Sequence, residues 1–436
     1  MREKKNIETY YAILGAIKSP FTYSIIDPKI PNERFKKLYE NKDFFLLYAN
    51  KRFKKIKNCK KYAINKVLKI NFRKSNINFY KIKKKNTYII YTSGSTGIAK
   101  GCCIGEDSII SFINIWKKIL KINANEQKNF SQLNPLYFDN SIFDFYVSIF
   151  TGSILSPINV DNVDDLMNVP NKILKLNCDV WFSVPSLLIY LINLRLLKSR
   201  HLKKLSYIIF GGEGFPKNKL KDLWRLKKKN LINVYGPSEC TCICSHHFIS
   251  KNDIFNDKEK FVSLGKISEN FKFKIANYSK KRLGELVLYG KGVGNGYFKN
   301  KKETKSRFII KNRKIIGYKT GDIIKIKNKK LYFMGRKDNQ VKIMGHRIEL
   351  EEIERQINNI KNINESLVTS NKHSELNNHL IAHLYLKKKI SDKKILKILK
   401  SKLPKYMIPN KLIFYKQPLK KNRNYKIDRN FYSKTI

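Results

Sequence analysis

The sequence predicts an α/β fold with a large N-terminal domain of layered α/β subdomains, including a β-rich portion, and a small α+β C-terminal lid domain. Short apolar runs alternate with helix-length segments along most of the chain, which is typical of α/β proteins. The chain has 436 residues, too many for one ordinary domain. After Gly335 the pattern changes to a compact mixture of helix and strand signals. We therefore expect a large domain over residues 1–336 and a small one over residues 337–436.

In the large domain, several apolar runs indicate strands that end in turns. Residues 87–91 are a β-rich run before a Gly/Ser/Thr loop, and residues 181–194 predict a core strand followed by a helix. Residues 205–210 and 231–235 each lead into a glycine-containing turn. Antiparallel β-structure with tight turns is expected for three later segments, residues 284–289, 323–326 and 330–334.

In the small domain, periodicity predicts two helices and a strand. Residues 348–360 place Ile353, Ile357 and Ile360 on one helix face. Residues 380–386 alternate as a strand does, and residues 391–403 indicate a helix that ends before a proline.

The composition is strongly basic, but the basic residues are not concentrated in one segment. The chain has 90 Lys and Arg against 34 Asp and Glu, a formal net charge of +56. Lys, Asn and Ile are abundant in every region, as A/T-rich codons would impose on any protein. A nucleic-acid-binding protein would more often gather its charge on one element, so no specific nucleic acid is expected as a partner. Hydrophobic residues make up 42% of the chain, which excludes global disorder.

Nothing in the sequence indicates a membrane protein. No apolar run approaches the roughly 18 residues needed to span a bilayer. Residues 1–9 are polar and no signal-peptide pattern follows them. The seven cysteines lack the spacing of a disulfide framework, which favours a reducing compartment. We expect a cytoplasmic protein with no membrane partner.

Residues 91–101 form the most informative stretch of the sequence, a loop suited to bind phosphate. Two glycines let the backbone approach an anion closely, and a lysine adds a positive charge. The spacing is not that of a Walker A loop. The expected phosphate-binding residues are Thr92, Ser93, Ser95, Thr96 and Lys100.

This loop resembles the signature of the adenylate-forming superfamily, in particular the amino-acid adenylation domains of nonribosomal peptide synthetases and the D-alanine–carrier-protein ligases. Further segments resemble the family's motifs in the family's order and together span nearly the whole chain. They are residues 233–239, 284–286 with 290–298, 318–322, 335–343 with 345–349, 403–409 and 424–429. The resemblance implies ATP and Mg²⁺ as cofactors and an aminoacyl-AMP as the product of the first step.

The resemblance also implies roles for residues around the nucleotide. Glu239 corresponds to the magnesium ligand, and a carboxylate oxygen suits that hard cation. Tyr235 offers a face to adenine, and Asp322 can accept hydrogen bonds from the ribose hydroxyls. The full expected adenine- and ribose-binding set is Gly212, Glu213, Asn233, Tyr235, Asp322 and Arg336.

Two lysines correspond to catalytic residues of the family. Lys426 is expected between the substrate carboxylate and the AMP oxygens, although Tyr425 replaces the family's usual glycine beside it. Lys342 is expected to act in the second step, thioester formation. Asp338 corresponds to the hinge about which the small domain rotates between the two steps.

Asp139 indicates an amino acid as the substrate. In amino-acid-activating members of the family this carboxylate pairs with the substrate ammonium, because an unpaired charge in an apolar cleft is costly. The competing interpretation is that Asp139 caps a helix. By family position the side-chain pocket contains Asn140, Phe143, Phe182, Ile209, Gly211, Val234, Cys242 and Ile243. These are mostly apolar, so we expect a small or medium uncharged side chain such as alanine or proline.

A run of cysteines and histidines after Glu239 invites a metal interpretation that its spacing does not support. Zinc ligands usually come as two separated pairs. We expect alternation along the strand after Glu239 to place several of these side chains on one face. The run consists of Cys240, Cys242, Cys244, His246 and His247.

The ends of the chain lead to two expectations. The family's second motif begins at residue 12, so the large domain is expected to be shortened at its N-terminus. No carrier-protein segment follows Lys426, so the acceptor is expected to be a separate phosphopantetheinylated carrier protein. The function predicted is an ATP-dependent amino-acid–carrier-protein ligase. The alternatives are an acyl- or aryl-CoA ligase of the same superfamily and a degenerate basic nucleic-acid-binding or scaffold protein.

Overall fold

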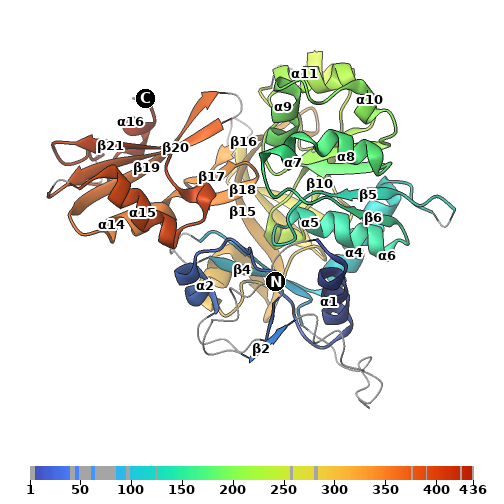
Figure 1. Cartoon of the computed structure of the whole chain (residues 1–436), viewed down its shortest axis with the longest axis horizontal. Helices are drawn as coiled ribbons and strands as arrows, with labels where there is room; N and C mark the ends of the chain where they lie inside the picture. The colour runs from blue at the N-terminus through green and yellow to red at the C-terminus, as the bar shows by residue number, and fades with distance from the viewer. Residues whose placement is uncertain are drawn as a thin grey trace. The chain divides into compact units, whose positions relative to one another are not determined.

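The computed structural model describes residues 5–39, 45–48, 60–63, 85–94, 99–123, 125–255, 259–278, 283–374, 377–388, 390–422 and 425–434. The chain divides into two compact units (Figure 1). Unit 1 comprises Met1–Pro28, Phe45–Tyr91 and Gly101–Lys337, and unit 2 comprises Lys29–Phe44, Thr92–Lys100 and Asp338–Ile436. The division near the C-terminus falls between Lys337 and Asp338. Unit 2 also takes in two N-terminal segments that the expected division into residues 1–336 and 337–436 assigned to the large domain.

The largest sheet of unit 1 has seven strands in the order β11-β10-β9-β8-β7-β5-β6. The strands from β5 to β9 pair in parallel, whereas β10 and β11 pair antiparallel. β7, β8 and β9 are buried along their whole length, as parallel strands covered by helices on both faces must be. The strands are β5 (Asn129–Gln132), β6 (Ile154–Pro157), β7 (Val180–Ser183), β8 (Tyr207–Gly211), β9 (Leu231–Tyr235), β10 (Ser245–Phe248) and β11 (Lys266–Ile267).

Helices connect the strands of this sheet, and a short π-helical segment lies near its centre. The π-helix η4 spans Phe143–Val147, and all its residues are buried. The helical segments are α4 (Glu106–Ile119), α5 (Asn140–Ile142), α6 (Ser148–Phe150), α7 (Val163–Met167), α8 (Val169–Lys175), α9 (Pro185–Asn193), α10 (Ser199–Leu202), α11 (Lys217–Leu226), the 3₁₀ turn η5 (Ser238–Cys240) and α12 (Lys251–Phe255).

The second sheet of unit 1 is antiparallel, in the order β12-β13-β15-β14, with β16 also paired to β15. It encloses a core that includes Leu286, Leu288, Tyr318 and Ile324. The long strand β15 pairs Asp322 with Arg336 of β16, which brings two expected site residues together. The elements are β12 (Phe271–Ala276), β13 (Leu283–Gly290), α13 (Lys301–Arg307), β14 (Phe308–Lys311), β15 (Lys314–Lys327) and β16 (Lys330–Arg336).

The N-terminal part of unit 1 packs around α1 (Ile7–Lys18), which Asn6 caps by accepting from the Thr9 amide. Tyr10 and Ile13 of this helix share a core with Tyr88 and Ile104. β3 (Tyr88–Thr92) and β4 (Lys100–Ile104) form a two-stranded sheet, and β1 (Phe45–Tyr48) pairs in parallel with β2 (Lys60–Ala63).

Unit 2 has a core of its own, built from the side chains of α14, α15 and a three-stranded sheet in the order β19-β20-β21. Ile353 and Ile357 of α14 are fully buried in it, as the helical periodicity predicts. Its elements are α2 (Asn32–Tyr39), β17 (Gln340–Ile343), β18 (His346–Glu349), α14 (Leu350–Asn358), β19 (Ile363–Ser374), β20 (Asn377–Leu386), α15 (Asp392–Lys402), η6 (Lys405–Met407), β21 (Lys411–Tyr415) and α16 (Arg429–Lys434).

The architecture confirms the predicted α/β class with a β-rich portion. One local expectation is wrong. The strand after Glu239 begins only at Ser245, because Thr241 and Cys242 take left-handed backbone angles (φ 52° and 69°) that interrupt an extended chain. In the part of the chain that the structure describes, no helix is long and apolar enough to cross a membrane.

Candidate active site

Two expected nucleotide-binding residues of unit 1 meet at the buried carboxylate of a third, Asp322. Tyr235 ends the buried strand β9 and donates its hydroxyl to Asp322 Oδ2 at 2.5 Å. Arg336 donates from Nη1 to Asp322 Oδ1, also at 2.5 Å. The Asp322 amide is fixed by Thr320 Oγ1 at 3.0 Å. Burial, followed by the charge of Asp322, raises the pKa of Tyr235 well above its ordinary value, so this hydroxyl remains a donor.

Glu239 is the second buried carboxylate of the site, and only 1% of its surface is exposed. It lies in η5, where Tyr297 donates its hydroxyl to Glu239 Oε1 at 2.6 Å. The Gly294 amide donates to the Glu239 carbonyl at 2.8 Å, which fixes the backbone as well. A carboxylate held in this way retains lone pairs for a hard cation. Mg²⁺ commonly binds one or two carboxylates together with substrate phosphates, so this donor set fits it.

The turn that carries Glu239 requires glycine at position 236. A Cβ there would lie 2.2 Å from the Cys242 carbonyl oxygen, so no other residue fits. The cysteines that follow are buried in this turn and loop rather than on one strand face. Within the described residues, no group of three or more His, Cys, Asp or Glu side chains is arranged to hold a metal ion.

Asp139 lies beside Glu239's segment and accepts a hydrogen bond from Ser238. It precedes α5, but its side chain makes no capping hydrogen bond to that helix. Asp139 therefore occupies the N-cap position of α5 without capping the helix through its side chain. Ser238 links the segment expected to bind the substrate ammonium to the segment expected to bind magnesium.

Most of the expected pocket residues belong to a single apolar cluster of unit 1. Phe143 is completely buried, with its ring centroid 4.8 Å from that of Trp116 and 5.3 Å from that of Phe182. Gly211 is confined as well, because a Cβ there would lie 2.4 Å from the Val234 carbonyl oxygen. The expected pocket members found in this cluster are Phe143, Phe182, Ile209, Val234, Cys242 and Ile243.

Asn140 is the polar member of this set. Its Oδ1 lies 4.0 Å from Cys242 Sγ, within the range of a weak thiol hydrogen bond. Its buried Nδ2 has no hydrogen-bond partner among the described residues. Such an orphan donor is costly in a folded protein, and a bound acceptor would satisfy it.

The remaining expected adenine-binding residues are placed as follows. Gly212 takes a φ of +88°, which favours glycine. Glu213 Oε1 accepts from Ser186 Oγ at 2.5 Å. The Asn233 side chain donates to the Ser263 carbonyl at 2.9 Å, which gives it a structural bond inside unit 1.

The phosphate loop belongs to unit 2, and its described residues contact β18 and α14 of that unit. Ser93 donates to the Arg347 carbonyl at 2.6 Å, and the Gly94 amide donates to Glu352 Oε2 at 3.2 Å. Lys100 is 3% exposed, and its Nζ lies 3.7 Å from Glu349 Oε1. Thr92 ends β3. The expected phosphate ligands Ser95 and Thr96 lie outside the described residues.

The two expected catalytic lysines and the expected hinge also lie in unit 2. Lys426 is exposed in a turn whose backbone is closed by Asn422, which donates its amide to the Lys426 carbonyl at 2.7 Å. Tyr425 before it has a φ of +59°, the left-handed conformation that the family's usual glycine adopts without strain. Lys342 on β17 is half-buried, and in the β17–β18 strand register it lies opposite Arg347. Asp338 is the first residue of this C-terminal segment of unit 2.

Residues 3–298 match the family described as AMP-binding enzyme. The D-alanine–D-alanyl carrier protein ligase of Lactococcus lactis is 33% identical, over 79% of this chain and 69% of the ligase. The chain belongs to the AMP-binding enzyme family.

Two further comparisons extend this result. Bacitracin synthase 1 of Bacillus licheniformis is 31% identical over 98% of this chain, which spans only 8% of that synthase. The Vibrio cholerae adenylation domain AlmE, solved with glycyl-adenosine-5'-phosphate, superposes with a TM-score of 0.80. It shares 21% identity and covers 98% of this chain and 86% of its own, which shows the fold. The resemblance to adenylate-forming ligases is confirmed at the level of the family.

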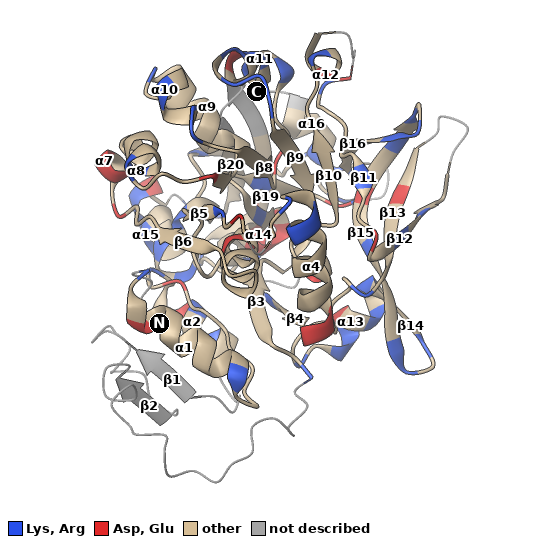
Figure 2. Cartoon of the chain, turned by 90° about the vertical axis from the view of Figure 1, so that its right-hand side faces the viewer, with Lys and Arg blue, Asp and Glu red and all other residues tan. Residues whose placement is uncertain are grey.

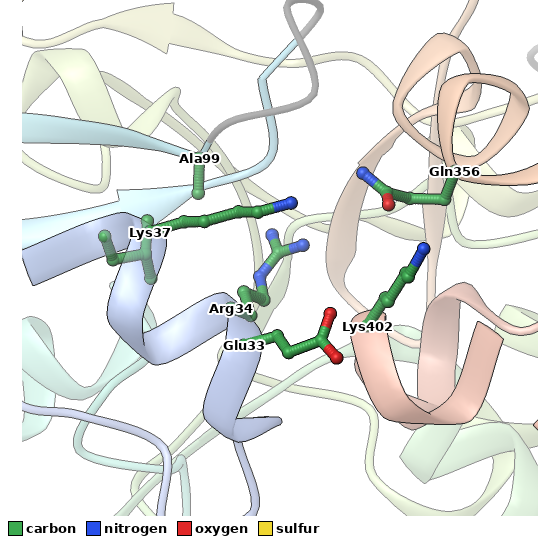
Figure 3. Close-up of a pocket in the computed structure, with 7 residues that line it drawn as sticks. Glu33, Arg34, Lys37, Ala99, Gln356 and Lys402 are labelled. Carbon is green, nitrogen blue, oxygen red and sulfur yellow. The ribbon is translucent and has the colours of Figure 1, made fainter. Parts of the chain in front are cut away.

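Sequence reasoning missed several residues that this AMP-binding enzyme places against the expected ones. Tyr297 lies inside the family-like segment 290–298, so its position carried a signal, but its bond to Glu239 was not foreseen. Arg34 and Glu352 form a largely buried ion pair, and no local pattern joins them. A hollow beside the phosphate loop is lined by Glu33, Arg34, Lys37, Leu38, Ala99, Gln356 and Lys402 (Figure 3). Three of these are cations, so the hollow is electropositive.

Proposed function

We propose that this chain is an amino-acid adenylating ligase that loads a carrier protein. In the first step a substrate carboxylate oxygen attacks the α-phosphorus of ATP, the bond to the β-phosphate breaks, and pyrophosphate leaves. In the second step the phosphopantetheine thiol attacks the acyl carbon of the aminoacyl-AMP, loses its proton, and AMP leaves. The observation that carries the proposal is the Ser238–Asp139 hydrogen bond, which joins a carboxylate suited to an ammonium to the Glu239 turn.

The residues of unit 1 divide the binding of ATP and amino acid. Asp322, held by Tyr235 and Arg336, accepts from the ribose hydroxyls, and the Tyr235 ring contacts adenine. Glu239 would hold Mg²⁺, which would supply positive charge to neutralise the phosphates. Asp139 holds the substrate ammonium, which orients the carboxylate for attack.

Lys100 and Lys426 supply the positive charge for the first step. Two anions must meet in this reaction, so fixed cations are the main catalytic need. Lys100 holds phosphate oxygens, and Lys426 stabilises the charge that develops between carboxylate and AMP.

The substrate is a small uncharged amino acid such as alanine. Phe143 and Phe182 fill the apolar cluster, and Gly211 has no room for a side chain. The carrier protein ligase of Lactococcus lactis carries D-alanine in its name, and AlmE was solved with glycyl-adenosine-5'-phosphate. Both facts support a small side chain here.

The hinge lies at Asp338, and Lys342 acts in the second step. The division between Lys337 and Asp338 supports this position. Asp338→Pro should restrict the backbone there and reduce thioester formation while leaving adenylate formation nearly unchanged.

The test is ATP–pyrophosphate exchange across a panel of amino acids, followed by transfer to pantetheine or coenzyme A as soluble thiols. Alanine or a similar small amino acid should give the highest exchange, and Lys426→Ala should reduce it by about 100-fold. Asp139→Asn should also lose exchange. The control is Asp165→Asn, which changes a carboxylate that lies outside the proposed site and pairs with Lys172, and it should keep exchange. Preference for a charged amino acid, or exchange driven by an aryl acid, would contradict the proposal.

A further inference from the structure

The phosphate loop in unit 2 is engaged by protein carboxylates. The Gly94 amide donates to Glu352 Oε2 at 3.2 Å, and Lys100 Nζ lies 3.7 Å from Glu349 Oε1. Both glutamates are buried, with 0% and 1% of their surfaces exposed. A backbone N–H and a lysine ammonium are the donors with which such a loop holds a phosphate oxygen.

Both glutamates have polar partners besides the loop. Glu352 also pairs with Arg34, and Glu349 accepts from the Gln340 side chain. Burying a carboxylate is unfavourable unless such partners compensate for the lost water. The loop therefore stabilises these acids, and the acids in turn hold the loop.

We propose that Glu349 and Glu352 occupy the loop in place of nucleotide phosphates, so that ATP or pyrophosphate and this pair of acids compete for it. The inference rests on the proposed function, in which the loop holds the phosphates of ATP. One N–H cannot serve a carboxylate and a phosphate oxygen at once, and a phosphate next to Glu349 would meet a like charge. Arg34, which faces the basic hollow with Lys37 and Lys402, keeps the region electropositive when Glu352 leaves (Figure 3).

The competition regulates the direction of the reaction. Once pyrophosphate has left, the acids return to the loop and oppose its rebinding. The aminoacyl-AMP is then protected from the reverse reaction until the thiol attacks. A ligand that must displace a contact formed in nine of ten free molecules binds about tenfold more weakly than it otherwise would.

The experiment uses calorimetry to measure the binding of Mg²⁺-pyrophosphate and of Mg²⁺-ATP. It compares the wild-type chain with a double variant that combines Glu349→Gln and Glu352→Gln. The variant should bind both ligands about tenfold more tightly, because the amides keep the shape and remove the charge. Glu351→Gln is the matched control. It changes the neighbouring glutamate of the same helix, whose carboxylate bonds Asn339 rather than the loop, and it should bind as wild type does.

A second measurement covers the case in which the double variant does not fold. Hydrogen exchange of the wild-type segment 345–356 should increase when Mg²⁺-pyrophosphate saturates the chain, since the contacts to the loop are then broken. Wild-type protein that binds neither ligand would refute the proposed function and this inference together. If the wild type binds both ligands, two results would refute this inference alone. The first is a folded double variant whose affinity equals that of the wild type. The second applies if the double variant does not fold, and is hydrogen exchange of segment 345–356 that pyrophosphate does not change.

Discussion

Replacing Tyr297 by Phe tests whether its bond to Glu239 positions the proposed magnesium ligand. The change removes one hydroxyl and keeps the ring, which packs edge-to-face on Phe308 with centroids 5.3 Å apart. The lost bond is 2.6 Å long and joins two side chains that are 6% and 1% exposed. A hydrogen bond to a buried charged group contributes about 2 kcal/mol, which corresponds to about a 30-fold change in an equilibrium constant. Mutating a group that hydrogen-bonds to a metal ligand typically lowers metal affinity by about 10- to 100-fold, which agrees with that figure.

The assay is ATP–pyrophosphate exchange at saturating amino acid over a series of free Mg²⁺ concentrations. The Mg²⁺ concentration that gives half-maximal exchange should rise by about 30-fold in the Tyr297→Phe protein. The dependence on amino-acid concentration should change little, because the Tyr297 hydroxyl bonds Glu239, whereas Ser238 bonds Asp139.

The matched control is Tyr207→Phe. Tyr207 is also buried in unit 1, and its hydroxyl makes no hydrogen bond within the described part of the chain. It should therefore leave the Mg²⁺ dependence unchanged. Equal Mg²⁺ dependence in wild type and Tyr297→Phe, with both proteins equally stable to urea, would refute the claim that the Tyr297 bond positions Glu239 for Mg²⁺.

Substitutions at two positions and one titration probe other parts of the structure. Arg336→Met leaves the buried Asp322 carboxylate without its cation, and the KM for ATP should rise by about tenfold or more, with partial recovery in Arg336→Lys. Gly211→Ala brings a methyl group to 2.4 Å from the Val234 carbonyl oxygen, so urea unfolding should show a loss of about 1–3 kcal/mol and exchange should fall. Burial lowers the pKa of His383 to about 4, so its NMR titration should have a midpoint far below the ordinary 6.5. Its contribution to stability is full above pH 6.5 and is lost as the pH falls toward 4, because only the unfolded histidine binds a proton in that range.

Each of these expectations has a result that contradicts it. An unchanged KM for ATP in Arg336→Met would show that Asp322 does not depend on its cation. Wild-type stability of Gly211→Ala would mean that β8 and β9 can separate at this point. A His383 midpoint near 6.5 would show that the imidazole reaches water.

Local signals were sufficient for many individual elements. Residues 231–235 were expected as a strand and are β9, because a short run of apolar and β-branched residues before Gly236-Pro237 favours nothing else. Residues 391–403 were expected as a helix, and α15 is Asp392–Lys402 with Ser391 as its cap. In both cases the propensity of the residues and the boundary signals agree.

The course of the chain after Glu239 could not be read locally. Cys and Thr favour extended backbone, and their alternation predicts a strand from residue 240. The structure instead bends at Thr241 and Cys242, where the turn packs against Gly236. Tertiary packing decides this conformation, and no property of the individual residues reveals it.

The placement of the phosphate loop in unit 2 was also beyond sequence reasoning. Ser93 contacts Arg347, and Arg34 contacts Glu352, across separations of 254 and 318 residues. Neither periodicity nor a motif encodes which of many charged residues will meet over such a distance. The loop itself was found because its glycines, hydroxyls and lysine are adjacent in sequence.

The distribution of buried charge explains how so basic a chain keeps an acidic site. Among the described residues the buried carboxyl side chains are Asp144, Glu239, Asp253, Glu285, Asp322, Glu349 and Glu352, and the buried cations are only Lys5, Lys100 and Lys128. Lys and Arg otherwise occur on helices and strands alike rather than on a single element (Figure 2). Changing the charge of an exposed residue alters the free energy of unfolding by about 0.5 kcal/mol or less, whereas removing one partner of a buried ion pair costs about 3–5 kcal/mol. A compositional bias toward lysine therefore accumulates at exposed positions and leaves the buried acids in place. For that reason the net charge of +56 says little about what the protein binds, whereas the buried carboxylates of Asp322 and Glu239 say much more.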